Sequence, residues 1–90
     1  MITRYQRHLM RHALGITQGI PFDKNGNPSR NHFATTEDTF DYPQIIELVH
    51  IGFMRPISPP LKSSYSVFVV TKEGMEYLGI IRGYSRGQDQ

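Results

Sequence analysis

The stretch from residue 41 to residue 78 restricts the fold of this chain most, because the signals of four short elements follow one another there. They read as a helix, a strand, a second strand and a final helix, with a glycine after the first helix and prolines between the strands. We predict the first helix, of about nine residues, from Asp41, which fits a capping box with Gln44, to the residue before Gly52. Such short elements predict a small α+β domain.

The two predicted strands differ in strength. Residues 53–57 form the weaker one, which Pro56 keeps short because proline cannot donate to a sheet. Residues 66–71 form the stronger one, since their side chains are apolar on both faces, and we expect both faces to be well covered. Thr71 then caps a final helix over residues 72–78. The sequence thus predicts a two-stranded hairpin between two helices.

An amphipathic helix is predicted over residues 2–14, capped by Thr3 and ended by Gly15. The face that we expect to be buried carries Ile2, Tyr5, Leu9, Met10 and Ala13. The opposite face carries Arg4, Arg7, His8 and Arg11. Burial of the apolar face would leave the basic face as a solvated stripe or as a contact surface.

The chain is long enough for one domain, which we place at residues 1–81, with a flexible C-terminal tail over residues 82–90. Within the domain, residues 19–31 predict an exposed loop and residues 32–35 a short strand or helical turn. The net charge is only +2, and the absence of cysteine excludes disulfides and thiolate chemistry. No run approaches the roughly 18 apolar residues of a membrane span, so we expect a soluble, cytoplasmic protein.

No motif in the chain carries the residues that catalysis or a cofactor requires. His8 and His12 have the helical spacing to share a metal, but no pattern in the sequence supplies the further ligands that a site needs. Residues 23–27 imitate the start of a calcium loop, yet Pro28 stands where that loop requires glycine. There is no nucleophile elbow and no glycine-rich phosphate loop. We therefore expect no enzymatic activity, no cofactor and no metal site.

Four segments of the chain resemble a group of small uncharacterised proteins of bacteriophages and prophages. They are RHALGI at 11–16, RNHFAT at 30–35, DYPQIIELVHIGFM at 41–54 and VFVVTKEGMEYL at 67–78. The resemblance covers most of the chain. It implies a phage-associated origin and the cytoplasm of a bacterial host, and it implies nothing about mechanism.

Residues 41–78 also resemble a winged-helix domain, in the helix ending LVxxGFM, the hairpin and the closing VTxEGxxxL segment. The resemblance implies about three helices, a recognition helix from residue 41 and a two-stranded β-hairpin wing. The exposed positions of that helix are Gln44, Glu47 and His50, which make it neutral to acidic. The helix thereby departs from the pattern, because DNA-reading helices are rich in Arg, Lys, Asn, Gln or Ser.

Two functions fit these observations, and both involve contact with another macromolecule. The first is protein–protein contact or self-association through aromatic and hairpin-tip residues, namely Phe33, Phe40, Tyr42, Pro59, Pro60 and Leu61. The alternative is DNA or RNA binding, with phosphates held by Arg4, Arg7, Arg11, Arg55 and Lys62 and bases read by Gln44 and His50. Because the recognition helix is neutral to acidic, the sequence favours the first.

Overall fold

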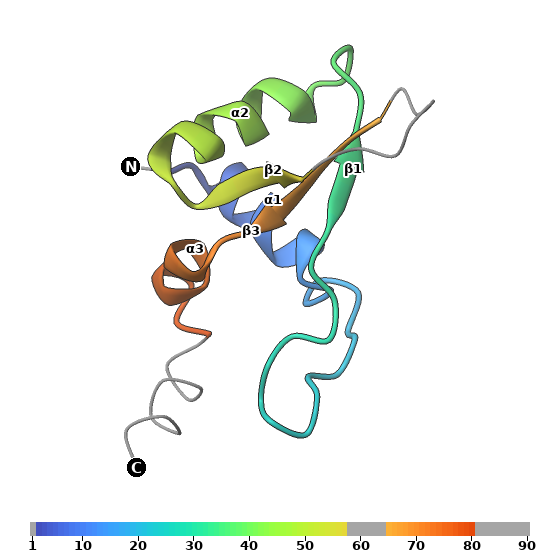
Figure 1. Cartoon of the computed structure of the whole chain (residues 1–90), viewed down its shortest axis with the longest axis vertical. Helices are drawn as coiled ribbons and strands as arrows, with labels where there is room; N and C mark the ends of the chain where they lie inside the picture. Colours follow the sequence, from blue (N-terminus) through green and yellow to red (C-terminus); the bar gives the residue numbers. More distant parts are fainter. Residues whose placement is uncertain (1, 58–64, 81–90) are drawn as a thin grey trace.

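The computed structural model describes residues 2–57 and 65–80, which form a small α+β domain (Figure 1). The elements are, in order, α1 (Arg4–Ala13), β1 (Phe33–Thr35), α2 (Asp41–Ile51), β2 (Met54–Ile57), β3 (Ser66–Val70) and α3 (Lys72–Tyr77). The predicted α+β class and the predicted helices are confirmed in this part of the chain. Two predictions, the hairpin tip at 58–64 and the tail at 82–90, lie outside the described residues.

The sheet has three antiparallel strands in the order β1-β3-β2, so the expected two-stranded hairpin is joined by β1 on the other side of β3. An asparagine side chain explains why β1 adds to the sheet. Asn31 donates from Nδ2 to the Val70 carbonyl at 3.0 Å and accepts from the Val70 amide at 2.8 Å. Its amide therefore continues the β1–β3 ladder beyond Phe33, the first residue of the strand.

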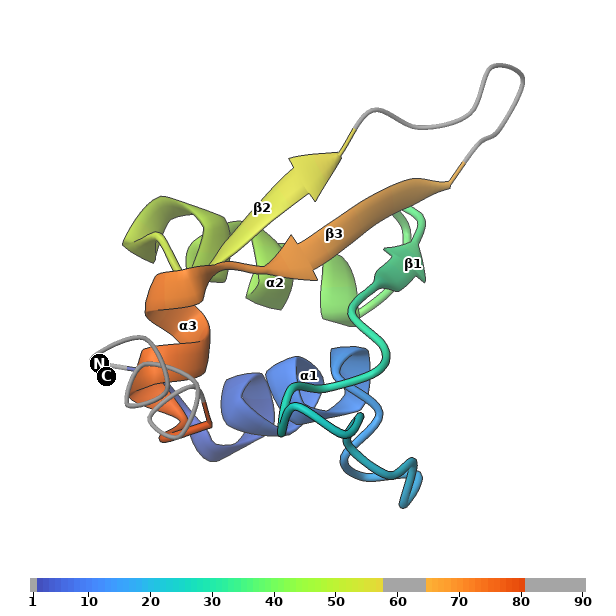
Figure 2. The ribbon, with the colours of Figure 1, turned by 60° about the horizontal axis from the view of Figure 1, so that its bottom comes forward.

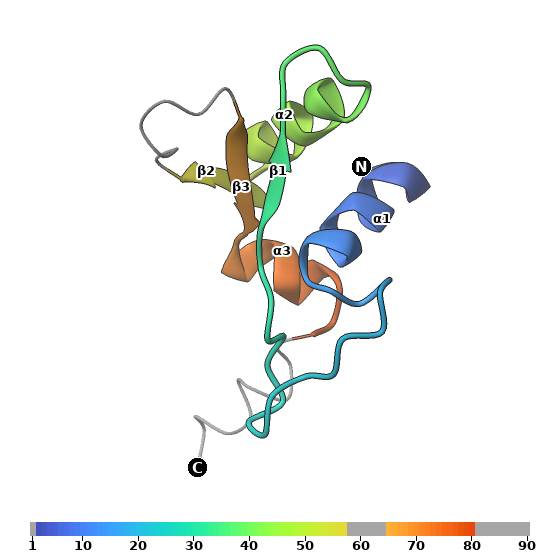
Figure 3. The same cartoon turned by 90° about the vertical axis from the view of Figure 1, so that its right-hand side faces the viewer.

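The two faces of the sheet have different environments. The inner face carries the buried side chains of Met54, Phe68 and Val70, which form one core with residues of α1 and α2. The outer face carries Val67 and Val69, which are only half-buried because α1 and α2 both lie on the other side of the sheet (Figure 3). The expectation that both faces of the strong strand are well covered was therefore wrong for the outer one.

Helix α1 forms as the sequence predicted, except that Gln6 is buried in place of Tyr5. The Thr3 hydroxyl accepts from the Gln6 amide at 3.0 Å, and the Gln6 side chain accepts from the Thr3 amide at 2.9 Å, which completes a capping box. Tyr5, expected on the buried face, is 40% exposed, whereas Gln6 is only 1% exposed. The next residue after the helix cap is Gly15, whose φ of 79° suits a chain reversal.

Helix α2 starts near the predicted residue by a different mechanism. The expected capping box of Asp41 and Gln44 was wrong, because the N-cap is Phe40 and no side chain caps the helix there. Asp41 is instead the first helical residue, and its carboxylate accepts a hydrogen bond from the Tyr5 hydroxyl. The predicted end is confirmed, since Gly52 takes a φ of 98° and donates to the Leu48 carbonyl.

Helix α3 follows β3 and lies at the end of the sheet where β2 begins (Figure 2). Thr71 caps it as predicted, since its hydroxyl oxygen accepts from the Gly74 amide at 3.1 Å. The same hydroxyl donates to the Gly52 carbonyl at 2.6 Å and so ties α3 to the end of α2. A Cβ at Gly74 would lie 2.3 Å from the Phe53 carbonyl oxygen, so this close approach requires glycine.

The loop between α1 and β1 has the predicted turn. The Asp23 carboxylate accepts from the amides of Asn25 and Asn27, both at 2.9 Å, and Gly26 has a φ of 83°. At the other end of the loop, the His32 amide donates to the Ala13 carbonyl at 3.0 Å and holds β1 beside α1. None of the helices that the structure describes has the length and apolar character to cross a membrane.

Candidate interaction surfaces

The exposed side of α1 carries the three arginines that the sequence identified. Arg4, Arg7 and Arg11 are exposed, and within the described ranges none of them forms an ion pair. Arg7 places its guanidinium carbon 5.4 Å from the ring centroid of Tyr77 in α3, which is within the range of a cation–π contact. Tyr77 in turn packs on Phe53, at 4.8 Å between ring centroids. Arg7 is thus partly used within the fold, while Arg4 and Arg11 have no charged partner among the described residues.

A row of rings runs along α1 beside these arginines. Phe40 lies 5.5 Å from Tyr5, Tyr5 lies 6.1 Å from His8, His8 lies 6.3 Å from His12, and His12 lies 5.6 Å from Phe33, all between ring centroids. We call these five residues the ring row. Phe40 is 70% exposed, Tyr5 and His8 are exposed, and His12 and Phe33 are half-buried. The row therefore presents its first three rings to solvent.

The Tyr5 hydroxyl in this row titrates abnormally. Its hydrogen bond to the Asp41 carboxylate raises the pKa of Tyr5 above the ordinary value of 10.0, with smaller contributions in the same direction from burial and from the Asp41 charge. The bond favours the neutral phenol because only that form can donate to Asp41. The ring row is in this way joined to the first turn of α2.

The outward side of α2 is a second surface, of different chemistry. Phe40, Pro43, Glu47, His50 and Ile51 are exposed along one side of the helix, and we call them the outer face of α2. Ile51 is 45% exposed, although it is a large apolar residue. The carboxylate of Glu47 accepts from the Gln6 side chain at 2.5 Å, so the charge in the middle of this face is already hydrogen-bonded.

The two residues predicted to read bases differ in position. His50 is exposed in the last turn of α2. Gln44 is half-buried, and its backbone carbonyl accepts from Gln6 Nε2 at 3.3 Å. The pair does not form the polar, outward-facing set that a DNA-reading helix presents.

The residues predicted to hold phosphates do not share one surface. Arg55 is paired with Val69 in the sheet register, and its neighbour Met54 is buried, so Arg55 lies on the outer face of the sheet. The arginines of α1 lie on the opposite side, because α1 packs against the inner face. Lys62 lies outside the described residues. The sequence suggested that the basic residues of α1 and of the wing bind phosphates together. The described residues do not bring them onto one surface.

The predicted protein-contact residues are also separated. Phe40 is exposed as expected, but Phe33 and Tyr42 are half-buried and pack against the core. Tyr42 turns inward because it belongs to α2 rather than to the loop before it, and its ring lies 6.2 Å from that of Phe68. The remaining members of this set, Pro59, Pro60 and Leu61, lie outside the described residues.

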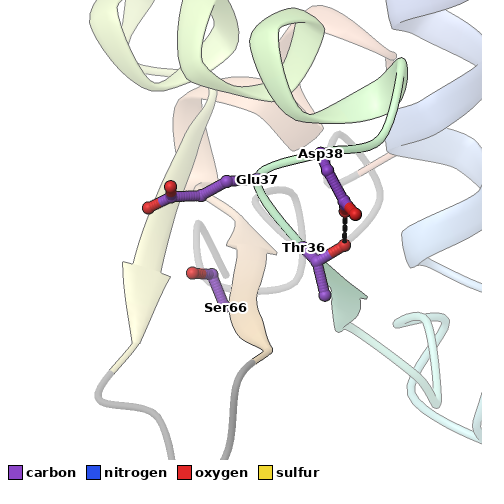
Figure 4. Close-up of a pocket in the computed structure, with 4 residues that line it drawn as sticks. All are labelled: Thr36, Glu37, Asp38 and Ser66. Carbon is purple, nitrogen blue, oxygen red and sulfur yellow. Dashed lines mark hydrogen bonds between the residues drawn. The ribbon is translucent and has the colours of Figure 1, made fainter.

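A shallow hollow of about 360 Å³ lies where β1 ends and β3 begins (Figure 4). Thr36, Glu37, Asp38 and Ser66 line it, and the Thr36 hydroxyl donates to the Asp38 carboxylate. Glu37 and Asp38 point in different directions, so they do not form the paired carboxylates of an acid–base site (Figure 4). Across the described ranges, no three His, Cys, Asp or Glu residues gather in a way that could hold a metal ion.

Two features of this geometry were missed by sequence reasoning. The sequence prediction divided the ring row, since it placed Tyr5 in the core and His8 on the basic face, and considered His8 and His12 as a metal pair. Their spacing of three and four residues was the available signal, because it places all three on one side of a helix. Gln6 had a local signal for its place in the Thr3 capping box, but its burial had none, since its partners Gln44 and Glu47 are distant in the sequence.

Comparison of the chain with protein-family models, with curated proteins and with solved structures returned no match.

Proposed function

We propose that the protein is a non-enzymatic interaction module that binds a protein partner through the outer face of α2, with self-association as the simplest case. The observation that carries this proposal is the presence of large apolar side chains on the outward side of α2 as well as on its buried side. Ile45 and Leu48 face the core, while Phe40 and Ile51 face outward and are 70% and 45% exposed. Large apolar side chains exposed beside polar ones on one helix face are typical of a contact surface, so the outward side of α2 suits a partner.

The proposal includes a phage origin, which the four segments similar to bacteriophage and prophage proteins suggest, and a finer fold assignment, which is a reduced winged helix. The support for the fold assignment is the order of elements, in which α2 leads directly into the β2–β3 pair and β1 closes the sheet on β3. Only α2 lies between β1 and β2, so the described residues lack the pair of consecutive helices that reads DNA in helix-turn-helix proteins. This reduction also favours a protein partner, because the groove-reading unit is incomplete.

Site-specific crosslinking tests the proposal, since the chain has no cysteine and one introduced thiol is unique. Ile51→Cys should give a disulfide-linked dimer under mild oxidation if two copies meet at α2. The matched control is Lys24→Cys, which places the thiol in the exposed loop before β1 and should remain monomeric. Sedimentation equilibrium of the unmodified chain should show a dimer that Ile51→Glu dissociates.

Two results together would overturn the proposal in both its forms. One is that the unmodified chain sediments as a monomer at all concentrations. The other is that Ile51→Glu retains every protein partner that the unmodified chain captures from infected or lysogenic cells. The second measurement is required because a partner other than a second copy leaves the free chain monomeric. Circular dichroism of both variants shows whether the fold is kept, as expected for an exposed position.

A further inference from the structure

We infer that the exposed side of α1 binds single-stranded nucleic acid, with unpaired bases stacked on the ring row and phosphates neutralised by Arg4 and Arg11. This surface is separate from the outer face of α2 except for Phe40, which closes one end of the ring row. The inference stands on three observations about α1, namely its charge, its rings and their arrangement around the helix.

The charge of α1 is entirely positive. The helix contains three arginines and no acidic residue, and none of these arginines forms an ion pair within the part of the chain that the structure describes. Asp41 and Glu47 keep their negative charges, but their partners on α1 are Tyr5 and Gln6 and not the arginines. A polyanion approaching Arg4 and Arg11 therefore meets positive charge that no ion pair offsets within the described residues.

The rings supply the second requirement of a single-strand site. Tyr5 and His8 are exposed and their planes lie within 27° of each other, so one side of the row offers two similarly oriented ring surfaces. Base–aromatic stacking does not depend on sequence, because every base has a flat π face. In a duplex those faces are covered by neighbouring bases, and this is why the surface suits an unpaired strand.

The third observation is how charge and rings are placed. Tyr5, His8 and His12 lie on one strip of the helix, and Arg4 and Arg11 lie on the adjacent strip, about 40–60° around the axis from His8 at about 100° per residue. The strip of rings spans about 10 Å along the axis at about 1.5 Å per residue. Bases and backbone of one strand can therefore lie side by side along α1, with the phosphates on the side away from Asp41.

Duplex DNA is a poorer fit to the same surface. A duplex binder holds phosphates over a wide area, but Arg55 lies on the opposite face of the sheet from α1. Gln44, predicted to read bases, is half-buried. The surface has stacking and charge but no edge-reading set, and this combination is typical of binding without sequence preference.

Fluorescence anisotropy with a labelled oligothymidylate of about twelve nucleotides, within the site sizes typical of single-strand binders, is the direct test. Binding should be stronger for this probe than for a duplex of the same length and should weaken steeply with salt. Arg4→Gln and Arg11→Gln should each reduce the slope of log K against log salt by about 0.7, the value for one phosphate contact on a single strand. Arg55→Gln, on the opposite face, is the matched control and should leave the slope unchanged.

Substitution of His8 separates stacking from charge. His8→Ala should raise the Kd about five-fold or more, the lower end expected for one lost base stack, whereas His8→Phe should keep the affinity of the unmodified chain. His8 is exposed and its described interactions are ring contacts, so both variants should fold, which circular dichroism checks. The inference is overturned if the probe does not bind at low salt, if the duplex binds more tightly, or if His8→Ala binds as well as His8→Phe.

Discussion

Helices α1 and α2 pack against the same face of the same sheet, yet their outward sides have opposite chemistry. In α1 the buried side is apolar apart from Gln6, and the outward side carries arginines, rings and no acidic residue. In α2 the apolar residues continue around the helix, so that Ile51 is exposed while Leu48 is buried. The comparison teaches that one small core can support two contact surfaces, one suited to a polyanion and one to an apolar partner.

The two helices are also joined to each other at two places of different kinds. One link is inside, where the side chain of Gln6 donates to the Glu47 carboxylate and to the Gln44 carbonyl. The other link is at the surface, where Tyr5 donates to Asp41. The inner link joins the buried sides of the two helices, and the surface link raises the pKa of Tyr5 in the ring row.

The largest expected effect separates the inward and outward sides of α2. Leu48 has no exposed surface, so Leu48→Ala should lower the free energy of unfolding by about 2–5 kcal/mol through lost burial and a cavity. Ile51→Ala, one turn away on the outward side, should change it by less than about 0.5 kcal/mol. Urea unfolding of both variants measures the difference. Equal losses would mean that the outer face of α2 belongs to the core.

The second prediction breaks the inner link between the helices. Gln6→Glu would place a buried carboxylate against Glu47, and we expect a loss of about 3 kcal/mol at neutral pH, because an uncompensated buried charge costs that much. The loss should shrink as the pH falls, since protonation of either carboxyl restores a hydrogen bond. Urea unfolding at several pH values measures both effects.

The matched control for this link is the double variant Gln6→Glu with Glu47→Gln, which exchanges donor and acceptor. It should recover part of the lost stability at neutral pH, because the pair again has one amide and one carboxylate, whereas the bond to the Gln44 carbonyl stays lost, since a carboxylate at position 6 cannot donate to it. If the double variant is as unstable as Gln6→Glu alone, the contact with Glu47 is not what makes Gln6 necessary.

The third prediction tests α3, which contacts both helices through the core. A Cβ at Gly74 would approach the Phe53 carbonyl that follows α2 and, at 3.0 Å, the Met10 side chain of α1. We expect Gly74→Ala to cost about 1–3 kcal/mol, because overpacking of a filled site forces the backbone to shift. Thermal unfolding measures it. Glu76→Ala, exposed on the same helix, is the control and should behave like the unmodified chain.

The smallest effect concerns the surface link. Asp41→Asn should lower the pKa of Tyr5 toward its ordinary value of 10.0, because the carboxylate that raises it is gone. The tyrosinate absorbance of each protein, minus that of its Tyr5→Phe variant, follows this one residue. A raised folded pKa favours the protonated phenol, so the link stabilises the fold fully below the unfolded pKa of about 10 and loses its effect as the pH rises through the folded pKa. An unchanged Tyr5 titration in Asp41→Asn would remove Asp41 as the cause.

Several elements could be predicted because their signals are local. The Thr3 capping box, the stop at Gly52 and the Thr71 cap each depend on residues within one turn of the chain. The same holds for the turn at Asp23, whose carboxylate bonds amides a few residues later. The candidate site was harder to predict, since Phe40 and Phe33 join the ring row through contacts with α1.

Local signals failed where a distant partner competed for the same group. Asp41 has the composition of a cap, but its carboxylate bonds Tyr5 across the fold and leaves the helix without a side-chain cap. Tyr5 was expected to be buried, but Gln6 takes the buried position because α2 supplies partners for its amide. Neither outcome follows from periodicity, since each depends on which helix face meets α1.

The amino-acid sequence by itself determined the helices, the two strands of the hairpin and their order, because hydrophobic period, caps and glycines act over a few residues. The tertiary structure decided the third strand, through the bonds of Asn31 to Val70, and it decided which charges share a face. Arg55 and Arg11 are equally basic in the sequence, but the sheet places them on opposite sides of the domain. The physical reason is that a surface is assembled from residues distant in the chain, whose neighbours are chosen by burial of the core and not by local preference.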